Sequence, residues 1–230
     1  MSNSFRYMME SMYGVPEHQI SGIHNMEIHH ALDFPSMAHH VDVPKLVKSH
    51  LTSTSSLDRA IHHHDPEVRL SALQSHSPHI NMSHIHSGLN DSHPLNRIQA
   101  LHTSTRVGNL SAEHLHTALQ DHNVDVQKAA LRHPSINRTH IDTAMHSPNA
   151  EIRHIAAMHH AASPQHVLNH IHNPETSMAH KIDAINRAPS MHESGLHGLL
   201  RHHDSAIQSA AHDALKVRTT PNSYHPLYRG

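Results

Sequence analysis

Residues 124–157 read VDVQKAALRHPSINRTHIDTAMHSPNAEIRHIAA, and this stretch holds two copies of one short pattern. The segments 124–131 and 150–157 place small apolar residues three and four positions apart, which is the period of an α-helix that packs closely on its neighbours. Between them, Asn137 stands where a helix N-cap belongs, flanked by Ile136 and Ile141 at the spacing of a hydrophobic staple. The stretch therefore predicts two short helices per cycle, joined by turns.

The same pattern recurs along most of the chain. Segments like 136–141 occur at 80–85, 110–115, 162–167 and, more loosely, 191–196, and second helices are expected at 66–73, 94–101 and 205–215. The predicted N-caps are Asn81, Ser111, Asn137 and Ser163. The apolar residues at the N4 positions follow one another at intervals of 26 to 30 residues.

Two short helices cannot bury their apolar stripes alone, so successive pairs must stack. The sequence predicts an all-α protein, a right-handed α-solenoid of about six to seven helix-turn-helix repeats over residues 26–217. Residues 1–25 are expected to be an N-terminal arm or cap rich in Met and Tyr, and residues 218–230 a C-terminal tail.

The motif in 124–157 resembles the leucine-rich-repeat-variant and HEAT-like α-solenoid repeat proteins. This resemblance covers residues 26–217 and implies an architecture, with little information on activity. Some members of the variant family carry a cysteine-ligated cluster. That feature is not expected here, because the chain has no Cys.

Histidine accounts for 35 of the 230 residues and recurs at two positions of the cycle. The N3 position of the first helix holds His84, His114, His140 and His166, and the end of the second helix is expected to hold His76, His102, His133 and His159. Recurrence at one place per repeat favours a structural role. We expect neutral rings at N3, where a cation opposes the helix dipole, and rings that favour protonation near helix C-termini.

The histidine spacings do not predict a metal site. The adjacent histidines at 62–64, 159–160 and 202–203 are expected to point apart along a helix, and His166 with His170 is the one clean i, i+4 pair. The chain also lacks a Gly-rich phosphate loop and a nucleophile elbow. We therefore expect no catalytic residue, no cofactor and no metal.

The favoured function is that of a non-enzymatic scaffold that binds other proteins, copies of itself included. It resembles repeat proteins of tailed phages and would be a structural part of an assembly such as a virus particle, or a cytoplasmic protein without a signal peptide or membrane span. The expected partner-binding residues lie at the chain ends: Phe5, Tyr7, Met8, Met9, Met12, Tyr13, Tyr224 and Tyr228.

Two alternatives remain open. A nucleic-acid-binding solenoid would use the basic residues near the start of each second helix, namely Arg69, Arg97, Lys128 and Arg153. A pH-responsive assembly protein would use the histidines, because their protonation would turn a formal net charge of −2 strongly positive.

Overall fold

The computed structural model describes residues 54–108 and 110–219 of the chain. Within these ranges it contains 12 α-helices and no β-strand, so the all-α prediction is confirmed. The described residues fall into two compact units, which divide between Leu110 and Ser111. The predicted N-terminal arm, the tail beyond Thr219 and all eight predicted partner-binding residues lie outside the described residues.

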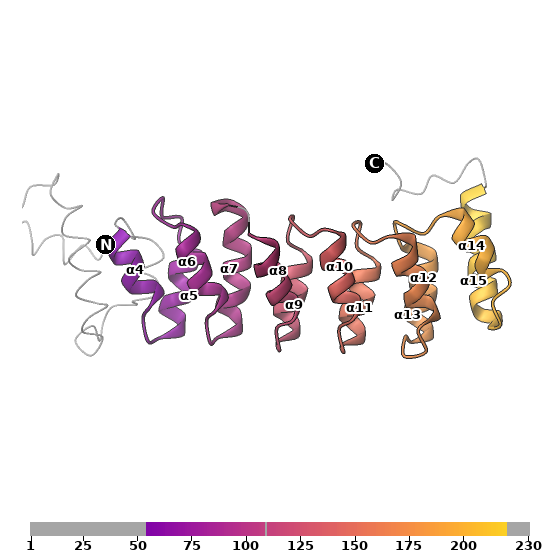
Figure 1. The fold of residues 1–230 in the computed structure, drawn as a ribbon, viewed down its shortest axis with the longest axis horizontal. Coiled ribbons are helices and arrows are strands. Elements are labelled where there is room, and N and C mark those ends of the chain that lie inside the picture. The colour runs from indigo at the N-terminus through magenta and orange to yellow at the C-terminus, as the bar shows by residue number, and fades with distance from the viewer. Residues whose placement is uncertain (1–53, 109, 220–230) are drawn as a thin grey trace, which may run out of the picture. The chain divides into compact units, whose positions relative to one another are not determined.

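The described residues of the first unit form four helices. They are α4 (Thr54–Ile61), α5 (Pro66–Gln74), α6 (Met82–Leu89) and α7 (Pro94–Val107). Helix α4 packs on α5 and α6 packs on α7, while α4 also contacts α6 and α5 contacts α7. The two helix pairs of this unit therefore pack against each other (Figure 1).

The described residues of the second unit, 111–219, form eight helices that repeat this arrangement. They are α8 (Ala112–Leu119), α9 (Val124–Leu131), α10 (Arg138–Met145), α11 (Ala150–Ala157), α12 (Pro164–His172), α13 (Met178–Arg187), α14 (Glu193–Leu199) and α15 (Ser205–Thr219). First helices contact first helices (α8 with α10, α10 with α12), and second helices contact second helices (α9, α11, α13 and α15 in turn). Pairs that follow one another in the sequence therefore lie next to one another within this unit (Figure 1).

Apolar N4 residues form the centre of the core in both units. All six of them have no exposed surface: Leu57, Ile85, Leu115, Ile141, Val167 and Leu196. The residues expected to staple them across the helix start are buried as well: Ile80, Leu110, Ile136, Ala162 and Met191. The pattern read from residues 136–141 thus identifies the side chains that fill the space between helices.

Each predicted N-cap residue lies directly before a first helix and bonds to its first turn. Asn81 accepts from the backbone N–H groups of Ser83 and His84, while Ser111, Asn137 and Ser163 each accept from the N–H of the histidine at N3. These bonds satisfy amide groups that the helix itself leaves unpaired.

Two helices differ most from the prediction, and α15 continues four residues beyond the predicted 205–215. Helix α7 was expected to end near residue 101 but continues to Val107, so His102 lies inside the helix, exposed, and not at its end. The reason is the sequence that follows. Pro134 comes directly after His133, whereas Thr103 follows His102 and extends the helix, with its hydroxyl donating to the Leu73 carbonyl at 2.9 Å. Helix α13, which begins at the Ser177 N-cap, is missing from the predicted second helices.

Candidate functional site

Three of the four histidines at N3 join their helix to the preceding pair. Nδ1 of His84, His140 and His166 accepts a hydrogen bond from the N-cap backbone N–H at 3.1, 3.1 and 3.0 Å. An Nδ1 that accepts a hydrogen bond carries no proton, so each ring is the Nε2–H tautomer and donates from its other side. The acceptors belong to the preceding first helix.

These acceptors are two carboxylates and one backbone carbonyl. Nε2 of His84 donates to Asp58 Oδ1 at 2.7 Å, and Nε2 of His166 donates to Asp142 Oδ1 at 2.6 Å. Nε2 of His140 donates to the Ala112 carbonyl at 3.2 Å. One imidazole thus caps its own helix and bonds to the neighbouring repeat, which is the structural role expected at N3.

His114 occupies the same N3 position with a different bond. Its Nδ1 lies 2.5 Å from the Ser111 hydroxyl oxygen. His114 belongs to α8, the first helix of the second unit.

At the turns, Nδ1 of a histidine accepts a hydrogen bond from the backbone N–H two residues later. Nδ1 of His133 accepts from Ser135 N–H, and Nδ1 of His159 accepts from Ala161 N–H, both at 3.1 Å. His76 lies at the corresponding place after α5 and is exposed. Burial, helped by neighbouring His160 and opposed by a bond to the Leu131 carbonyl, lowers the pKa of His159. The expectation that a helix C-terminus favours protonation is therefore wrong at His159, because burial outweighs the dipole.

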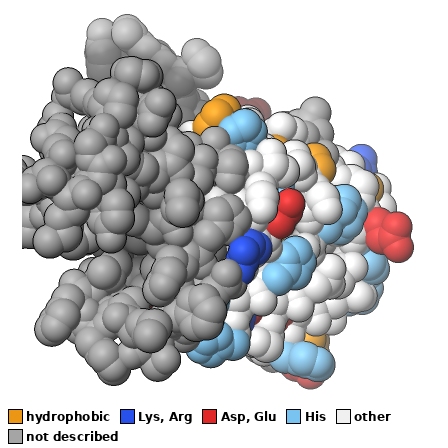
Figure 2. Space-filling model, turned by 90° about the vertical axis from the view of Figure 1, so that its left-hand side faces the viewer, with side chains coloured by type: hydrophobic (Ala, Val, Ile, Leu, Met, Phe, Trp, Pro, Cys, Tyr) orange, Lys and Arg blue, Asp and Glu red, His pale blue; other side chains and the backbone are white. Residues whose placement is uncertain are grey.

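The adjacent histidines also differ from the expectation. They lie in turns, where the rings of a pair come together with centroids 4.2 Å apart instead of pointing apart. His166 and His170 share helix α12 but face different partners, Asp142 and His154. Histidine side chains are also scattered over the face seen in Figure 2 and do not gather in one patch.

Three of the predicted nucleic-acid-binding cations are bonded within the protein. Nη1 of Arg69, Arg97 and Arg153 donates in each case to two carbonyls of the preceding turn, at 2.8 to 3.2 Å. Arg69 also makes two bonds to Asp91, and Arg153 bonds to Glu175, so both connect to the turn of the next pair. The N4 position of the second helix is therefore a bracing position.

Lys128 does not occupy the N4 position of its helix. In α9 the bracing position holds Gln127, whose Nε2 donates to the Asp121 carbonyl at 2.5 Å, and Gln208 makes the equivalent bond to His202 in α15. Lys128, one residue later, lies 2.8 Å from Glu151 on α11. It too bonds to the neighbouring pair, by a different geometry.

The hydrogen bonds of the Arg69 brace also change the pKa of Asp91. Burial by itself raises the pKa of Asp91, but hydrogen bonds from Arg69, Asn96 and the His93 N–H outweigh it, and the pKa falls to about 2. A carboxylate with that many donors is held in its charged form.

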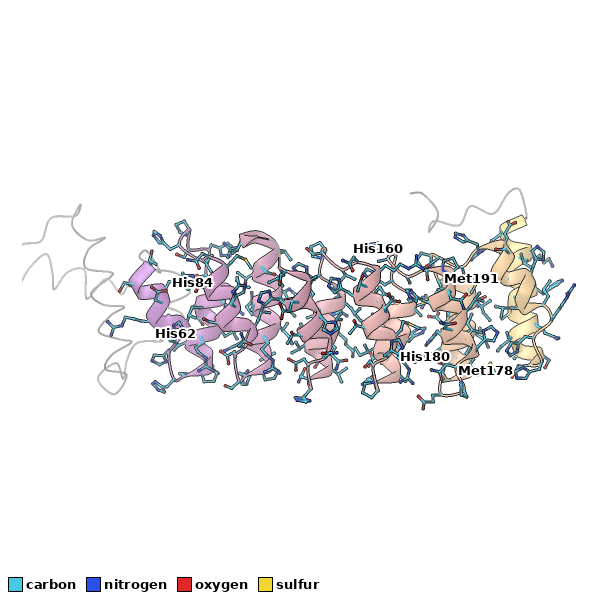
Figure 3. The ribbon with its side chains drawn as sticks, in the orientation of Figure 1. His62, His84, His160, Met178, His180 and Met191 are labelled. Atoms are coloured by element: carbon cyan, nitrogen blue, oxygen red, sulfur yellow. The ribbon has the colours of Figure 1, made fainter. Side chains whose placement is uncertain are left out.

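One group of histidines departs from the repeat pattern. His154 on α11, His170 on α12 and His180 on α13 bring one ring nitrogen each to within 4.8 Å of one another, the one such set of three or more possible ligands among the described residues. His154 Nδ1 lies 3.2 Å from His170 Nε2, and the rings of His154 and His180 stack at 4.1 Å. His180 lies near the start of α13 beside Met178 (Figure 3).

Burial and mutual proximity weaken the basicity of this group. Burial lowers the pKa of His170 to about 4, with further lowering by His154 and His180. Burial and the charge of His180 lower the pKa of His154, against an opposing hydrogen bond to Asp183. The rings of His154 and His170 are therefore neutral at pH 7.

Sequence spacing could not reveal this cluster. Its members come from three helices at separations of 16 and 10 residues, whereas the prediction considered ligands on one helix or at one position per repeat. The available signal was His180 itself. With Ser177 as N-cap it stands at the N3 position of a second helix, where the other described pairs have no histidine.

Comparison with protein-family models, with curated proteins and with solved structures finds no match for this chain. In the described residues, no helix has the length and apolar character needed to cross a membrane.

Proposed function

We propose that this chain is a non-enzymatic helical-repeat scaffold that binds other proteins, including further copies of itself, as a structural component of an assembly. In this proposal its helix pairs continue as one right-handed α-solenoid of about six to seven repeats. The affinity would come from an extended surface to which many pairs contribute.

The observation that carries the proposal is the use of polar side chains between neighbouring pairs. Arg69 with Asp91, Arg153 with Glu175, and His166 with Asp142 each connect one pair to the next. Such bonds are expected in a repeat protein, where each helix pair is stabilised by contacts with the neighbouring pairs. The described residues expose only three large hydrophobic side chains to a third or more, Leu95, Met178 and Val217, so a partner would meet a largely polar surface.

The nucleic-acid alternative receives less support. It requires cations that reach phosphates, and the arginines proposed for that role already donate to two turn carbonyls each. A formal net charge of −2 adds no long-range attraction for a polyanion.

Affinity purification of the full chain followed by native mass spectrometry tests the proposal. We expect a protein complex of fixed stoichiometry, homomeric or heteromeric, that survives nuclease treatment and about 0.3 M salt. Co-purified DNA or RNA whose binding weakens steeply between about 50 and 200 mM salt would instead support the nucleic-acid alternative. A monomer that retains no protein under mild conditions contradicts the scaffold function.

A further inference from the structure

We propose that His154, His170 and His180 form a binding site for a divalent transition-metal ion of the zinc type, within the second unit. Three observations carry this: the convergence of three ring nitrogens, the acceptors behind two of the rings, and the buried third nitrogen. The sequence spacings do not predict this site.

Two of the three ring nitrogens already have nearly the required separation. In a tetrahedral zinc site with Zn–N distances of about 2.0–2.1 Å, two ligand nitrogens lie roughly 3.3 Å apart. His154 Nδ1 and His170 Nε2 are 3.2 Å apart. One ring nitrogen of His180 lies within 4.8 Å of the ligand nitrogens of the other two rings, and Nδ1 of His180 is buried and makes no hydrogen bond with any described residue.

The two other nitrogens of His154 and His170 face oxygen atoms that can orient the rings. His154 Nε2 lies 3.1 Å from Asp183 Oδ2, and His170 Nδ1 lies 3.5 Å from the Thr176 hydroxyl. A ligand histidine normally donates its second N–H to such an oxygen, which fixes the tautomer and raises the ligand's basicity. Asp183 is held in turn by two hydrogen bonds from Arg187, at 2.6 and 2.9 Å.

Metal binding requires two small local changes. Without metal, Nε2–H of His170 donates to His154 Nδ1, so the proton must move to Nδ1 of His170, where the Thr176 hydroxyl can accept it. The His180 ring, stacked on His154 with an interplanar angle of 6°, must rotate so that the ion lies in its plane. A water molecule would complete the four ligands.

The donor set selects the class of ion. Three neutral imidazoles suit zinc, copper, nickel and cobalt, whereas calcium and magnesium prefer oxygen ligands. Because the site takes one ligand from each of α11, α12 and α13, the bound ion would connect two successive helix pairs.

The test must separate this site from weak binding by the other histidines. We would strip the full chain with EDTA, titrate it with cobalt(II) while recording visible absorption, and then measure zinc affinity against a chromophoric chelator. His180→Phe removes the ligand nitrogen but keeps an aromatic ring that can stack on the ring of His154. His172→Ala removes an exposed histidine of α12 and serves as the matched control.

We expect one tight zinc site with tetrahedral cobalt absorption in the wild type and in His172→Ala, and an affinity at least about 10-fold lower in His180→Phe. Asp183→Asn should lower the affinity by about 10- to 100-fold. Melting curves in EDTA check folding, and His180→Gln replaces the Phe variant if that variant is destabilised. Equal titrations for all variants, or no site above the background of weak histidine binding, would overturn the proposal.

Discussion

Single histidine residues in this protein act through both ring nitrogens at once. At N3, Nδ1 accepts the N-cap N–H while Nε2–H donates to the preceding repeat, as in His166 between Ser163 and Asp142. Glutamate or glutamine at this position could form the capping box, but neither has two nitrogens on separate sides of a rigid ring. The recurrence of histidine at N3 therefore has a physical reason that needs no ligand.

His140 offers a direct test of this double role. His140→Ala removes a side chain that is 3% exposed and bonds both to Asn137 N–H and to the Ala112 carbonyl. We expect a loss of about 1–3 kcal/mol in the free energy of unfolding, measured by urea denaturation, because two backbone groups lose a partner. His140→Gln should recover part of this loss through the capping bond. If both variants unfold like the wild type, the bonds of His140 contribute nothing.

Buried histidines of low pKa make stability depend on pH. His170 has a pKa of about 4 in the folded protein and about 6.5 when unfolded, so the unfolded chain takes up the proton first as the pH falls. His154 and His159 shift in the same direction. This stability is fully present above about pH 6.5 and is lost as the pH falls towards 4.

We therefore expect metal-free protein to lose roughly 2 kcal/mol or more between pH 7.5 and 5, as measured by urea denaturation with circular dichroism. Asp91 does not contribute in this range, because its pKa of about 2 makes its effect appear below pH 4. Superimposable curves at pH 7.5 and 5 would contradict the assignment of His170 as a buried neutral ring.

Between helices, close packing depends on small residues at defined places. A Cβ added at Gly88 of α6 would lie 2.9 Å from the Ala100 Cβ and 2.9 Å from a Leu73 methyl, so α6 can approach α5 and α7 only with glycine there. Gly198 of α14 has no described atom within 4 Å of such a Cβ.

The two glycines should respond to alanine in opposite ways. Gly88→Ala is expected to lower the free energy of unfolding by about 1–3 kcal/mol through overpacking. Gly198→Ala should raise it by about 0.5–1 kcal/mol, since alanine lowers the backbone entropy of the unfolded chain. Thermal and urea denaturation of both variants would check this, and a stabilised Gly88→Ala would show that α6 is not tightly packed.

The braces between pairs should be worth far more than surface ion pairs. Arg153 is 6% exposed and donates to the Ser147 and Pro148 carbonyls as well as to Glu175. Arg153→Met should cost about 2–4 kcal/mol, because it leaves these carbonyls without a donor. Arg187, exposed and paired with Asp183 four residues earlier, is the control, and Arg187→Met should cost clearly less than Arg153→Met. Equal costs in urea denaturation would refute a bracing role.

Sequence periodicity was sufficient for helices whose starts and stops are chemically marked. The cap Asn137 and the buried Ile141 could be identified from one repeat, since both follow from local rules. The length of α7 could not be predicted in this way, because no residue before Gly108 marks the end of the helix. The cluster of His154, His170 and His180 depends on how three helices meet, which no single-helix spacing encodes.

At the scale of the whole molecule, each helix pair depends for its stability on the pairs next to it. Within the second unit every pair contacts the pairs before and after it in the sequence, and the polar bonds between pairs follow the same order. Stability in such an array is a sum of weak intrinsic terms and nearest-neighbour contacts. Damage to one pair should therefore spread to its neighbours and decline with distance along the chain.

Hydrogen exchange on the full chain with Ile141→Ala tests this claim most directly. Ile141 has no exposed surface, so its truncation leaves a cavity in α10 that costs about 2–5 kcal/mol. We predict that amide protection falls most in α10 and α11, less in α8, α9, α12 and α13, and least in α14 and α15. An equal loss of protection over all eight helices would show one cooperative core and would contradict the account.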